Sequence, residues 1–451
     1  MDNNSSSGPV APTELNLAVN LEEAMAIGVR RLREGRLEAA EAVYQAVLAV
    51  APEHADALHF LGVQRHQLGQ HEAAIALIRK AIMAAPGYAD AHNNLGNLYK
   101  EQGELEKARE AYVKAIEINP RHVGAYNNLG VTMRALGRAD AAVEILLKAL
   151  DLAPDNADIL QNLGNAYRSQ KKYIEATGAY RRAIAIRPYD REAYKYLAIT
   201  LYYMNERQEA IKLLQQWLAF DPESPSARHL LAAHTGDQIP ERASDPYVRE
   251  LFDDFAASFD QVLQNINYRA PELIGRRVAT VFSDARGDLK ILDAGCGTGL
   301  CGPRLRAYAR RLVGVDLSPK MLAKAQVRNV YDDLVECELT DYLSAASDIF
   351  DVIVSADTLC YFGRLEAVLA AARRGLTSRG WLIFSLEKAD PLLARQEFSL
   401  GPHGRYSHSE AYVRAALAEA GFEIIETSTE VLRQEMQNDV AGLLLTARAM
   451  A

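Results

Sequence analysis

A proline recurs at a fixed interval of 34 residues through the first half of the chain. The positions are Pro52, Pro86, Pro120, Pro154, Pro188 and Pro222, and the interval holds without an insertion. A period of this length is typical of a helix-turn-helix unit that stacks on copies of itself, because one such unit cannot bury its apolar face alone. We therefore expect the front half to be a helical solenoid.

Small and large residues also repeat at this period. Two successive units carry the same pattern of leucine, glycine, alanine and bulky residues: Leu95, Gly96, Tyr99, Ala108, Tyr112 and Ala115, then Leu129, Gly130, Met133, Ala142, Leu146 and Ala149. Small residues let two antiparallel helices touch, and the larger ones fill the space between them. This pattern resembles the tetratricopeptide repeat family, with six units over residues 21–224.

The remaining boundaries follow from changes in composition. Residues 1–20 are polar and are expected to be a disordered tail, and residues 225–246 are expected to form a capping helix and a linker. From Tyr247 onward, short apolar runs alternate with helical patterns, which indicates a parallel sheet with crossover helices. Residues 247–451 are therefore expected to form a separate α/β domain.

A row of asparagines precedes the repeat leucine in three successive units, at Asn94, Asn128 and Asn162. An amide has both donors and an acceptor, so such a ladder could hold the backbone of an extended peptide. It is similar to the asparagine ladder in the repeats of O-linked N-acetylglucosamine transferase, and this resemblance implies peptide binding. The alternative is that these amides bond between neighbouring repeats and serve only the geometry of the solenoid.

The second half contains a glycine-rich turn after a predicted strand, in the segment I-L-D-A-G-C-G-T-G-L at 291–300. Three glycines at alternate positions let the backbone turn sharply and approach a ligand closely. A dinucleotide fingerprint would require glycine where Leu300 stands. A second acid, Asp316, closes the next apolar run, where open α/β sheets place the carboxylate that binds a ribose.

The motif D-x-G-x-G-x-G followed by this second acid resembles the class I S-adenosylmethionine-dependent methyltransferase family. The resemblance covers the whole second half and implies a Rossmann-like, seven-stranded α/β fold with a reversed final strand, and S-adenosylmethionine as the cofactor. The predicted strands are residues 289–293, 312–316, 334–337, 350–355, 381–386, 422–428 and 441–447. The overall fold class is thus a multidomain chain, with an all-α solenoid followed by this domain.

The resemblance also assigns cofactor-binding residues. They are Asp293, Ala294, Gly295, Cys296, Gly297 and Gly299 of the turn, Asp316 for the ribose, Leu317, Met321, Glu338 and Leu339 around the adenine, and Ala356 at the end of the fourth strand. Phe252, Phe255 and Phe259 resemble part of a lid segment, and their helical spacing favours a buried core face over cofactor contact. Tyr268 and Arg269 are the better candidates for polar cofactor contacts.

A base is needed only if the methyl acceptor arrives protonated. The leading candidate is His408, because an imidazole titrates near neutrality. Tyr406 and Asp357 are further catalytic candidates, together with His403 and Arg405. The alternative for His408 is an ordinary position on the surface.

Composition excludes several classes of partner. A net charge of −9 disfavours nucleic acid and anionic membranes as partners. The four cysteines form no C-x-x-C pair, so we expect no metal site from them. The start of the chain is polar and lacks an apolar signal segment, which favours a cytoplasmic location.

These observations predict a methyltransferase whose repeats recruit a peptide or protein, which is either the acceptor or a partner. Two alternatives remain open. The acceptor could be a small molecule, with the repeats used only for docking, or the chain could be a non-catalytic adaptor with a remnant methyltransferase fold. The intact turn and both acids favour a working enzyme.

Overall fold

The computed structural model describes residues 21–256, 259–346, 349–390, 397–435 and 438–451. The predicted tail at 1–20 lies outside these residues. The chain divides into two compact units, residues 1–166 and 167–451. The division falls within one helix, α9 (Ala157–Ser169).

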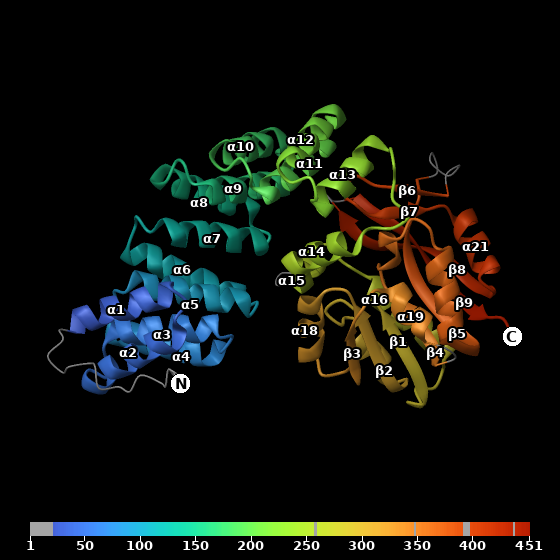
Figure 1. Ribbon diagram of the computed structural model, residues 1–451, viewed down its shortest axis with the longest axis horizontal. Coiled ribbons are helices and arrows are strands. Elements are labelled where there is room, and N and C mark those ends of the chain that lie inside the picture. Colours follow the sequence, from blue (N-terminus) through green and yellow to red (C-terminus); the bar gives the residue numbers. More distant parts are fainter. Residues whose placement is uncertain (1–20, 257–258, 347–348, 391–396, 436–437) are drawn as a thin grey trace, which may run out of the picture. The chain divides into compact units, whose positions relative to one another are not determined.

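The first half of the chain is a run of antiparallel helices (Figure 1). The helices are α1 (Leu21–Arg33), α2 (Leu37–Val50), α3 (Ala55–Gln67), α4 (His71–Ala84), α5 (Ala89–Glu101), α6 (Leu105–Ile118), α7 (Val123–Ala135), α8 (Ala139–Leu152), α9 (Ala157–Ser169), α10 (Tyr173–Ile186), α11 (Arg191–Tyr203), α12 (Arg207–Phe220) and α13 (Pro225–Thr235). This confirms the helical solenoid predicted from the proline period.

The repeating glycines explain how the helices of each pair pack. A Cβ added at Gly96 would lie 2.5 Å from Cε1 of Tyr112, and one at Gly130 would lie 2.5 Å from Cγ of Leu146. Both contacts are closer than any side chain tolerates. In each of these helix pairs, a glycine on the first helix therefore leaves room for a large side chain of the second helix to pack against its backbone.

The second half contains a twisted sheet with helices on both faces (Figure 1). Its strands are β1 (Leu289–Ala294), β2 (Ala309–Asp316), β3 (Asp333–Glu336), β4 (Phe350–Ser355), β5 (Leu376–Lys388), β6 (Phe398–Leu400), β7 (Tyr406–His408), β8 (Phe422–Glu435) and β9 (Asn438–Ala449). The order β3-β2-β1-β4-β5 is parallel throughout. β9 runs antiparallel to both β5 and β8, so the reversed final strand is confirmed.

Helices before and between the strands complete the domain. They are α14 (Asp245–Phe255), α15 (Phe259–Asn265), α16 (Ala270–Val281), α17 (Gly302–Leu305), α18 (Pro319–Val327), α19 (Leu339–Ala345), α20 (Glu366–Gly375) and α21 (Glu410–Glu419). The seven predicted strands are all present. The structure adds the short strands β6 and β7, and β7 occupies part of the segment that was expected to be a loop.

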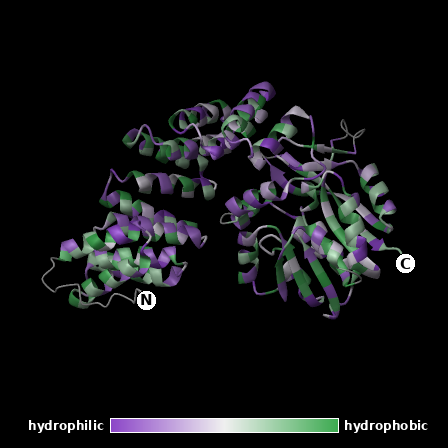
Figure 2. Cartoon of the chain, in the orientation of Figure 1, coloured by the Kyte–Doolittle hydropathy of each residue, from purple (hydrophilic) through white to green (hydrophobic). Residues whose placement is uncertain are grey.

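Alternate residues of the central strands enter two separate cores. In β1, Ile291 packs with the core under α16, and Leu292 packs with the core under α19, α20 and α21. Because successive side chains of a strand point to opposite faces, near-continuous apolar strands are required here. The central strands are accordingly hydrophobic over much of their length, with charged residues nearer their ends (Figure 2). Burial on both faces leaves the carboxyl ends of the strands as the place where polar groups converge.

Candidate active site

The glycine turn after β1 uses its three glycines for different reasons. Gly295, Gly297 and Gly299 all have positive φ, at 74°, 54° and 83°. A Cβ at Gly295 would strike the Thr358 side chain at 2.1 Å, whereas one at Gly297 would meet only a ring carbon of Phe259, at 3.9 Å. Gly295 is thus required by packing, and Gly297 leaves open space above the backbone.

Asp316, at the end of β2, lies beside this open space. Its Oδ2 accepts a hydrogen bond from the Gly297 N–H at 2.8 Å, and its Oδ1 accepts one from the Ser318 N–H at 2.9 Å. Burial raises the pKa of this carboxyl, although these N–H donors oppose the shift. Each carboxylate oxygen still has a lone pair to offer, because it can accept more than one hydrogen bond.

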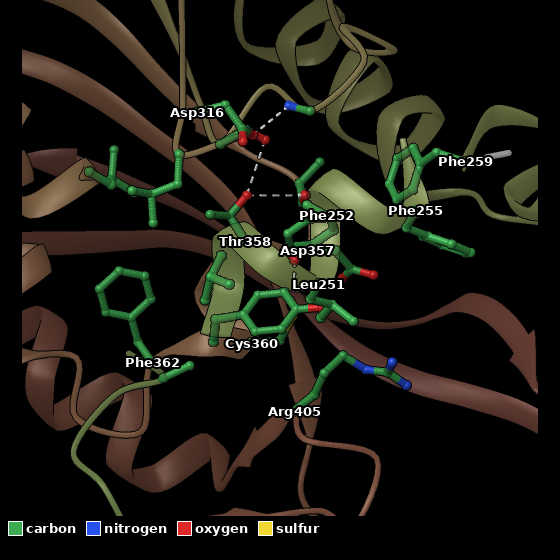
Figure 3. Close-up of a pocket in the computed structure, with 18 of the residues that line it drawn as sticks. Leu251, Phe252, Phe255, Phe259, Asp316, Asp357, Thr358, Cys360, Phe362 and Arg405 are labelled. Atoms are coloured by element: carbon green, nitrogen blue, oxygen red, sulfur yellow. Dashed lines mark hydrogen bonds between the residues drawn. The ribbon is translucent and has the colours of Figure 1, made fainter. Parts of the chain in front are cut away.

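A cavity of about 390 Å³ opens over the turn and the strand ends. Among the predicted cofactor residues, its walls include Tyr268, Gly295, Gly297, Asp316, Leu317, Glu338, Leu339 and Ala356, and the predicted catalytic residue Asp357 is also in the wall. Figure 3 shows Asp316, with its bond to the turn, at one end of the view and Arg405 at the other. The structure therefore brings most of the predicted cofactor residues together around one space.

The other predicted cofactor residues lie outside the cavity lining. Asp293 is buried, and its Oδ2 accepts a hydrogen bond from the Tyr331 hydroxyl at 2.6 Å. Burial raises the pKa of Asp293 to about 7, even though the Tyr331 hydroxyl lowers it. Ala294, Cys296, Gly299, Met321 and Arg269 also lie outside the lining. Ala294, Cys296 and Gly299 belong to the end of β1 and the turn after it, whereas Met321 lies in α18 and Arg269 precedes α16.

Three phenylalanines form an apolar wall of the cavity. Phe252 and Phe255 come from α14 and Phe259 from the start of α15, and all three line the space. The ring centroids of Phe255 and Phe259 lie 5.5 Å apart, with the rings edge to face. Figure 3 shows the two side chains next to each other. The helical spacing of these rings favoured a buried core face, whereas the structure places them in the lining of the cavity. Their helical spacing was the same in either case, so it did not distinguish the two.

A network of buried charges closes the opposite end. Arg433 of β8 contacts Asp357, Glu387 and Glu435, and its Nε lies 2.7 Å from the Glu435 carboxylate. Arg405 also pairs with Glu387 and Glu435. Burial favours protonation of Glu387, but the two guanidinium groups outweigh it and hold the pKa of this carboxyl at about 2. Arg433, Glu387 and Glu435 were not predicted from the sequence, because β8 and β5, which carry them, are far apart in the chain.

Asp357 follows β4 in an unusual backbone conformation. Its φ is +55°, its N–H donates to Oγ of Ser385 at 3.0 Å, and its Oδ2 lies 2.5 Å from a nitrogen of Arg433. A non-glycine residue held in the left-handed region is a strain that surrounding contacts must maintain. Burial raises the pKa of Asp357, and Arg433 opposes that shift. The cavity thus has one carboxylate of raised pKa at its charged end.

Comparison with known proteins identifies the family. Residues 292–384 match the family model of a methyltransferase domain, and models of the tetratricopeptide repeat match residues 25–89, 89–122, 122–188 and 167–233. The ubiquinone biosynthesis O-methyltransferase of Thiobacillus denitrificans is 31% identical over 183 residues, which are 35% of this chain and 78% of the relative. The chain belongs to the methyltransferase family. Its front half consists of tetratricopeptide repeats.

Two further proteins are each similar to part of this chain. The malonyl-[acyl-carrier protein] O-methyltransferase of Geobacter sulfurreducens is 30% identical to this methyltransferase, over 41% of this chain and 72% of the relative. Among solved structures, pilF of Pseudomonas aeruginosa is similar over 47% of this chain and 96% of its own, with 20% identity and a TM-score of 0.43.

No helix among the described residues combines the length and apolar character needed to traverse a lipid bilayer.

The methyltransferase domain places His408 and Tyr406 away from the cavity. His408 is buried, its Nε2 lies 3.0 Å from the Gly363 carbonyl oxygen, and burial lowers its pKa to about 4. The Tyr406 hydroxyl donates to the Pro240 carbonyl at 2.8 Å. Residues two apart in a strand share a face, so both side chains point from β7 to the same side of the sheet, where both are buried. Their neighbours His403 and Arg405 do line the cavity.

The helix after the last repeat contacts the loop that carries these neighbours. His229 of α13 is buried, and its Nε2 lies 2.9 Å from the Gly404 carbonyl oxygen, which accepts the bond. The His229 ring also stacks on Tyr247 at 4.1 Å. Gly404 has a φ of +84°, and a Cβ there would lie 2.2 Å from the Tyr247 hydroxyl. The end of the repeat half therefore supports one wall of the methyltransferase cavity.

The asparagine ladder of the repeats forms bonds within itself. Nδ2 of Asn128 donates to both Asn93 and Asn97 of the preceding unit, each at 3.1 Å. Nδ2 of Asn162 donates to Asn127 at 2.9 Å. Asn94 is paired with a ring nitrogen of His59 at 2.8 Å. The arrangement matches the alternative in which these amides join neighbouring units, and peptide binding by Asn94, Asn128 and Asn162 stays a prediction.

Proposed function

We propose that this chain is an S-adenosylmethionine-dependent methyltransferase that methylates an oxygen of a small, largely apolar acceptor, with its repeats docking a protein partner. The observation that carries the cofactor assignment is the open space above Gly297, which lies directly beside the Asp316 carboxylate. A nucleoside needs both a backbone without a Cβ and an acid within reach of its ribose.

The residues around the cavity fit this cofactor. A Cβ at Gly297 would project into free space that the cofactor can occupy, and Asp316 keeps lone pairs available for a ribose diol. Glu338 is the N-cap residue of α19, is buried, and lines the same cavity. Its carboxylate already accepts the Asp341 N–H at 2.9 Å, which fixes its position beside the place proposed for the adenine.

When bound, S-adenosylmethionine supplies a methyl group activated by a positively charged sulfur. The protein's residues then have to orient the acceptor and exclude water. Phe252, Phe255 and Phe259 supply an apolar surface for the acceptor and remove water from that side of the cavity. The charged network at the other end contains three carboxylates and two guanidinium groups, so its formal charge of −1 favours a cationic donor.

Asp357 is the residue proposed to take the acceptor's proton. It lines the cavity, and its raised pKa makes it a stronger base than an ordinary aspartate. Glu387 is unsuitable because its pKa is held at about 2. His408 and Tyr406 are given structural positions in this proposal, since neither ring borders the cavity.

Support for a small acceptor comes from the apolar wall and from the relatives. The two methyltransferase relatives in the comparison are a ubiquinone biosynthesis O-methyltransferase and a malonyl-[acyl-carrier protein] O-methyltransferase. A second proposal, a peptide acceptor held by the asparagine ladder, is favoured by the three successive amides themselves. That proposal requires the peptide to displace or supplement bonds that the amides already make.

Methyl transfer from isotopically labelled S-adenosylmethionine tests these proposals. Incubation of the full chain with a cell extract is expected to label an apolar small compound that partitions into organic solvent. Label in a protein band would favour the peptide acceptor. Calorimetric binding of S-adenosylmethionine without label transfer to any fraction would favour the non-catalytic adaptor, and the absence of any binding would overturn the cofactor assignment.

A further inference from the structure

Two histidines and a glutamate meet at the junction of the second and third repeat units. His66 lies near the end of α3, His71 begins α4, and Glu101 ends α5. Gly69, with a φ of +72°, makes the left-handed turn between the two histidines. That turn brings both imidazoles to the same side of the junction, where Glu101 reaches them from the next unit.

The ligand-type atoms of the three side chains converge. Nε2 of His66 lies 2.6 Å from Oε2 of Glu101, and Nδ1 of His71 lies 3.8 Å from the same oxygen. All three atoms are within 4.8 Å of one another. Around a tetrahedral zinc ion, ligands at about 2.1 Å from the metal stand about 3.4 Å apart. Small side-chain rotations therefore suffice to place all three atoms on one ion.

One of these atoms lacks a partner. Nδ1 of His71 is screened from solvent and has no hydrogen-bond partner, although the side chain as a whole is 42% exposed. A polar atom without a partner or water is unfavourable, so such an atom requires an explanation. Its direction toward Glu101 is consistent with a ligand for an ion. The exposed remainder of the side chain leaves a route by which the ion can enter.

Repeat packing does not account for these residues. One period later, the equivalent positions hold Lys100, Leu105 and Ala135, and one period earlier they hold Leu32, Leu37 and Gln67. Neither set could bind a metal, yet those junctions stack in the same way. The three ligand-type side chains are therefore an addition at a single junction.

We propose that His66, His71 and Glu101 bind one divalent cation of the zinc class, which joins the second and third repeat units. Two imidazole nitrogens with one carboxylate suit zinc or a neighbouring transition metal, whereas calcium and magnesium prefer oxygen ligands alone. Three protein ligands leave one coordination position for water. The ion would connect α3, α4 and α5 and would satisfy the unpaired nitrogen of His71.

The test is zinc binding to the full chain, prepared without an affinity tag and treated with a chelator. Calorimetry is expected to show one zinc ion per chain, and the midpoint of thermal unfolding should rise with free zinc concentration by mass action. His71→Ala and Glu101→Gln are each expected to weaken zinc binding by about tenfold or more. Far-UV circular dichroism checks that both variants retain their helices.

His92→Ala is the matched control, because this solenoid histidine bonds to the Pro86 carbonyl oxygen and is not part of the cluster. It should bind zinc as the unaltered chain does. The proposal is overturned if the unaltered chain binds no zinc, or if His71→Ala and Glu101→Gln bind it with unchanged affinity. In the first case the three side chains form only a cluster in which His66 is hydrogen-bonded to Glu101.

Discussion

The asparagine ladder and the Asp316 carboxylate at the methyltransferase cavity both present polar groups from regular elements, but their hydrogen-bonding capacity is used differently. Both donors of the Asn128 amide are taken up by the preceding repeat unit. The Asp316 carboxylate, by contrast, has one bond per oxygen and stands beside open space. A pattern of polar residues therefore indicates a ligand site only where unused hydrogen-bonding groups lie beside open space.

The largest expected effect tests the charged end of the cavity. Asp357→Asn is expected to lower kcat by about 100- to 10,000-fold, because the proton acceptor is lost. Steady-state kinetics with the identified acceptor measure this, and calorimetry should show S-adenosylmethionine affinity unchanged. Because burial raises the pKa of Asp357, activity of the unaltered enzyme should fall with decreasing pH above the ordinary aspartate range. A variant with normal kcat would exclude Asp357 as the base.

Asp316→Ala tests the proposal that this carboxylate binds the ribose of S-adenosylmethionine. Losing two hydrogen bonds to a charged acceptor is expected to weaken S-adenosylmethionine binding by about a hundredfold, since each contributes about 1.5 kcal/mol. Calorimetry measures the affinity, and circular dichroism should show the repeats still folded. The exposed Glu336→Gln, on the next strand, is the control. Equal affinity in Asp316→Ala would show that the ribose lies elsewhere.

The buried acid behind the turn predicts a dependence of stability on pH. The pKa of Asp293 is about 7 in the folded domain and about 4 in an unfolded chain. Between these values the folded state binds the extra proton, so stability falls as pH rises from 4 to 7, by up to about 4 kcal/mol. Thermal unfolding of Asp293→Asn should show a smaller loss over this range than the unaltered chain. Parallel curves would mean that Asp293 ionises normally.

His229→Asn tests how far the repeat half supports the cavity wall. Loss of the bond to Gly404 is expected to raise KM for the acceptor by about fivefold, equivalent to about 1 kcal/mol, while cofactor affinity stays unchanged. The longer His229→Gln places its amide N–H near the position of Nε2, which the shorter asparagine amide does not reach, and should restore part of the effect. Kinetics with both variants, and with His92→Asn as control, separate this role from a general loss of folding. An unchanged KM in His229→Asn contradicts it.

The smallest expected effect on catalysis belongs to the ladder. Replacing Asn94, Asn128 and Asn162 with alanine should lower repeat stability by about 1 kcal/mol per lost bond, while leaving transfer to a small acceptor unaltered. Denaturant unfolding and the isotopic assay measure the two quantities. A normal stability with a raised KM for a peptide acceptor would instead support the peptide groove.

Periodic features were the most predictable from sequence. The proline interval and the glycine positions specify helix pairs locally, because each unit contacts mainly its neighbours. The glycine turn and Asp316 were equally accessible, since both follow predicted strands whose ends must meet at one edge of a parallel sheet. These inferences required only short-range patterns and the order of the strands.

What could not be predicted depended on long-range pairing. Arg433 reaches Asp357 across 76 residues and Glu387 across 46, and no local pattern links them. His408 was predicted to be a base because of the chemistry of imidazole. The pairing of β7 with β5 instead buries the His408 side chain away from the cavity, whereas Arg405 lines the cavity. The direction of the Phe255 face was ambiguous because a helical stripe is the same whether it meets a core or a ligand.

The contact between α13 and Gly404 has a consequence for engineering this chain. An isolated catalytic fragment that begins at the linker would lack His229, and with it the support for the backbone on which Arg405 is mounted. Minimal versions should therefore start no later than Tyr167, where the second compact unit begins. The repeats nearest the catalytic half are in this sense part of the structural frame of the methyltransferase domain.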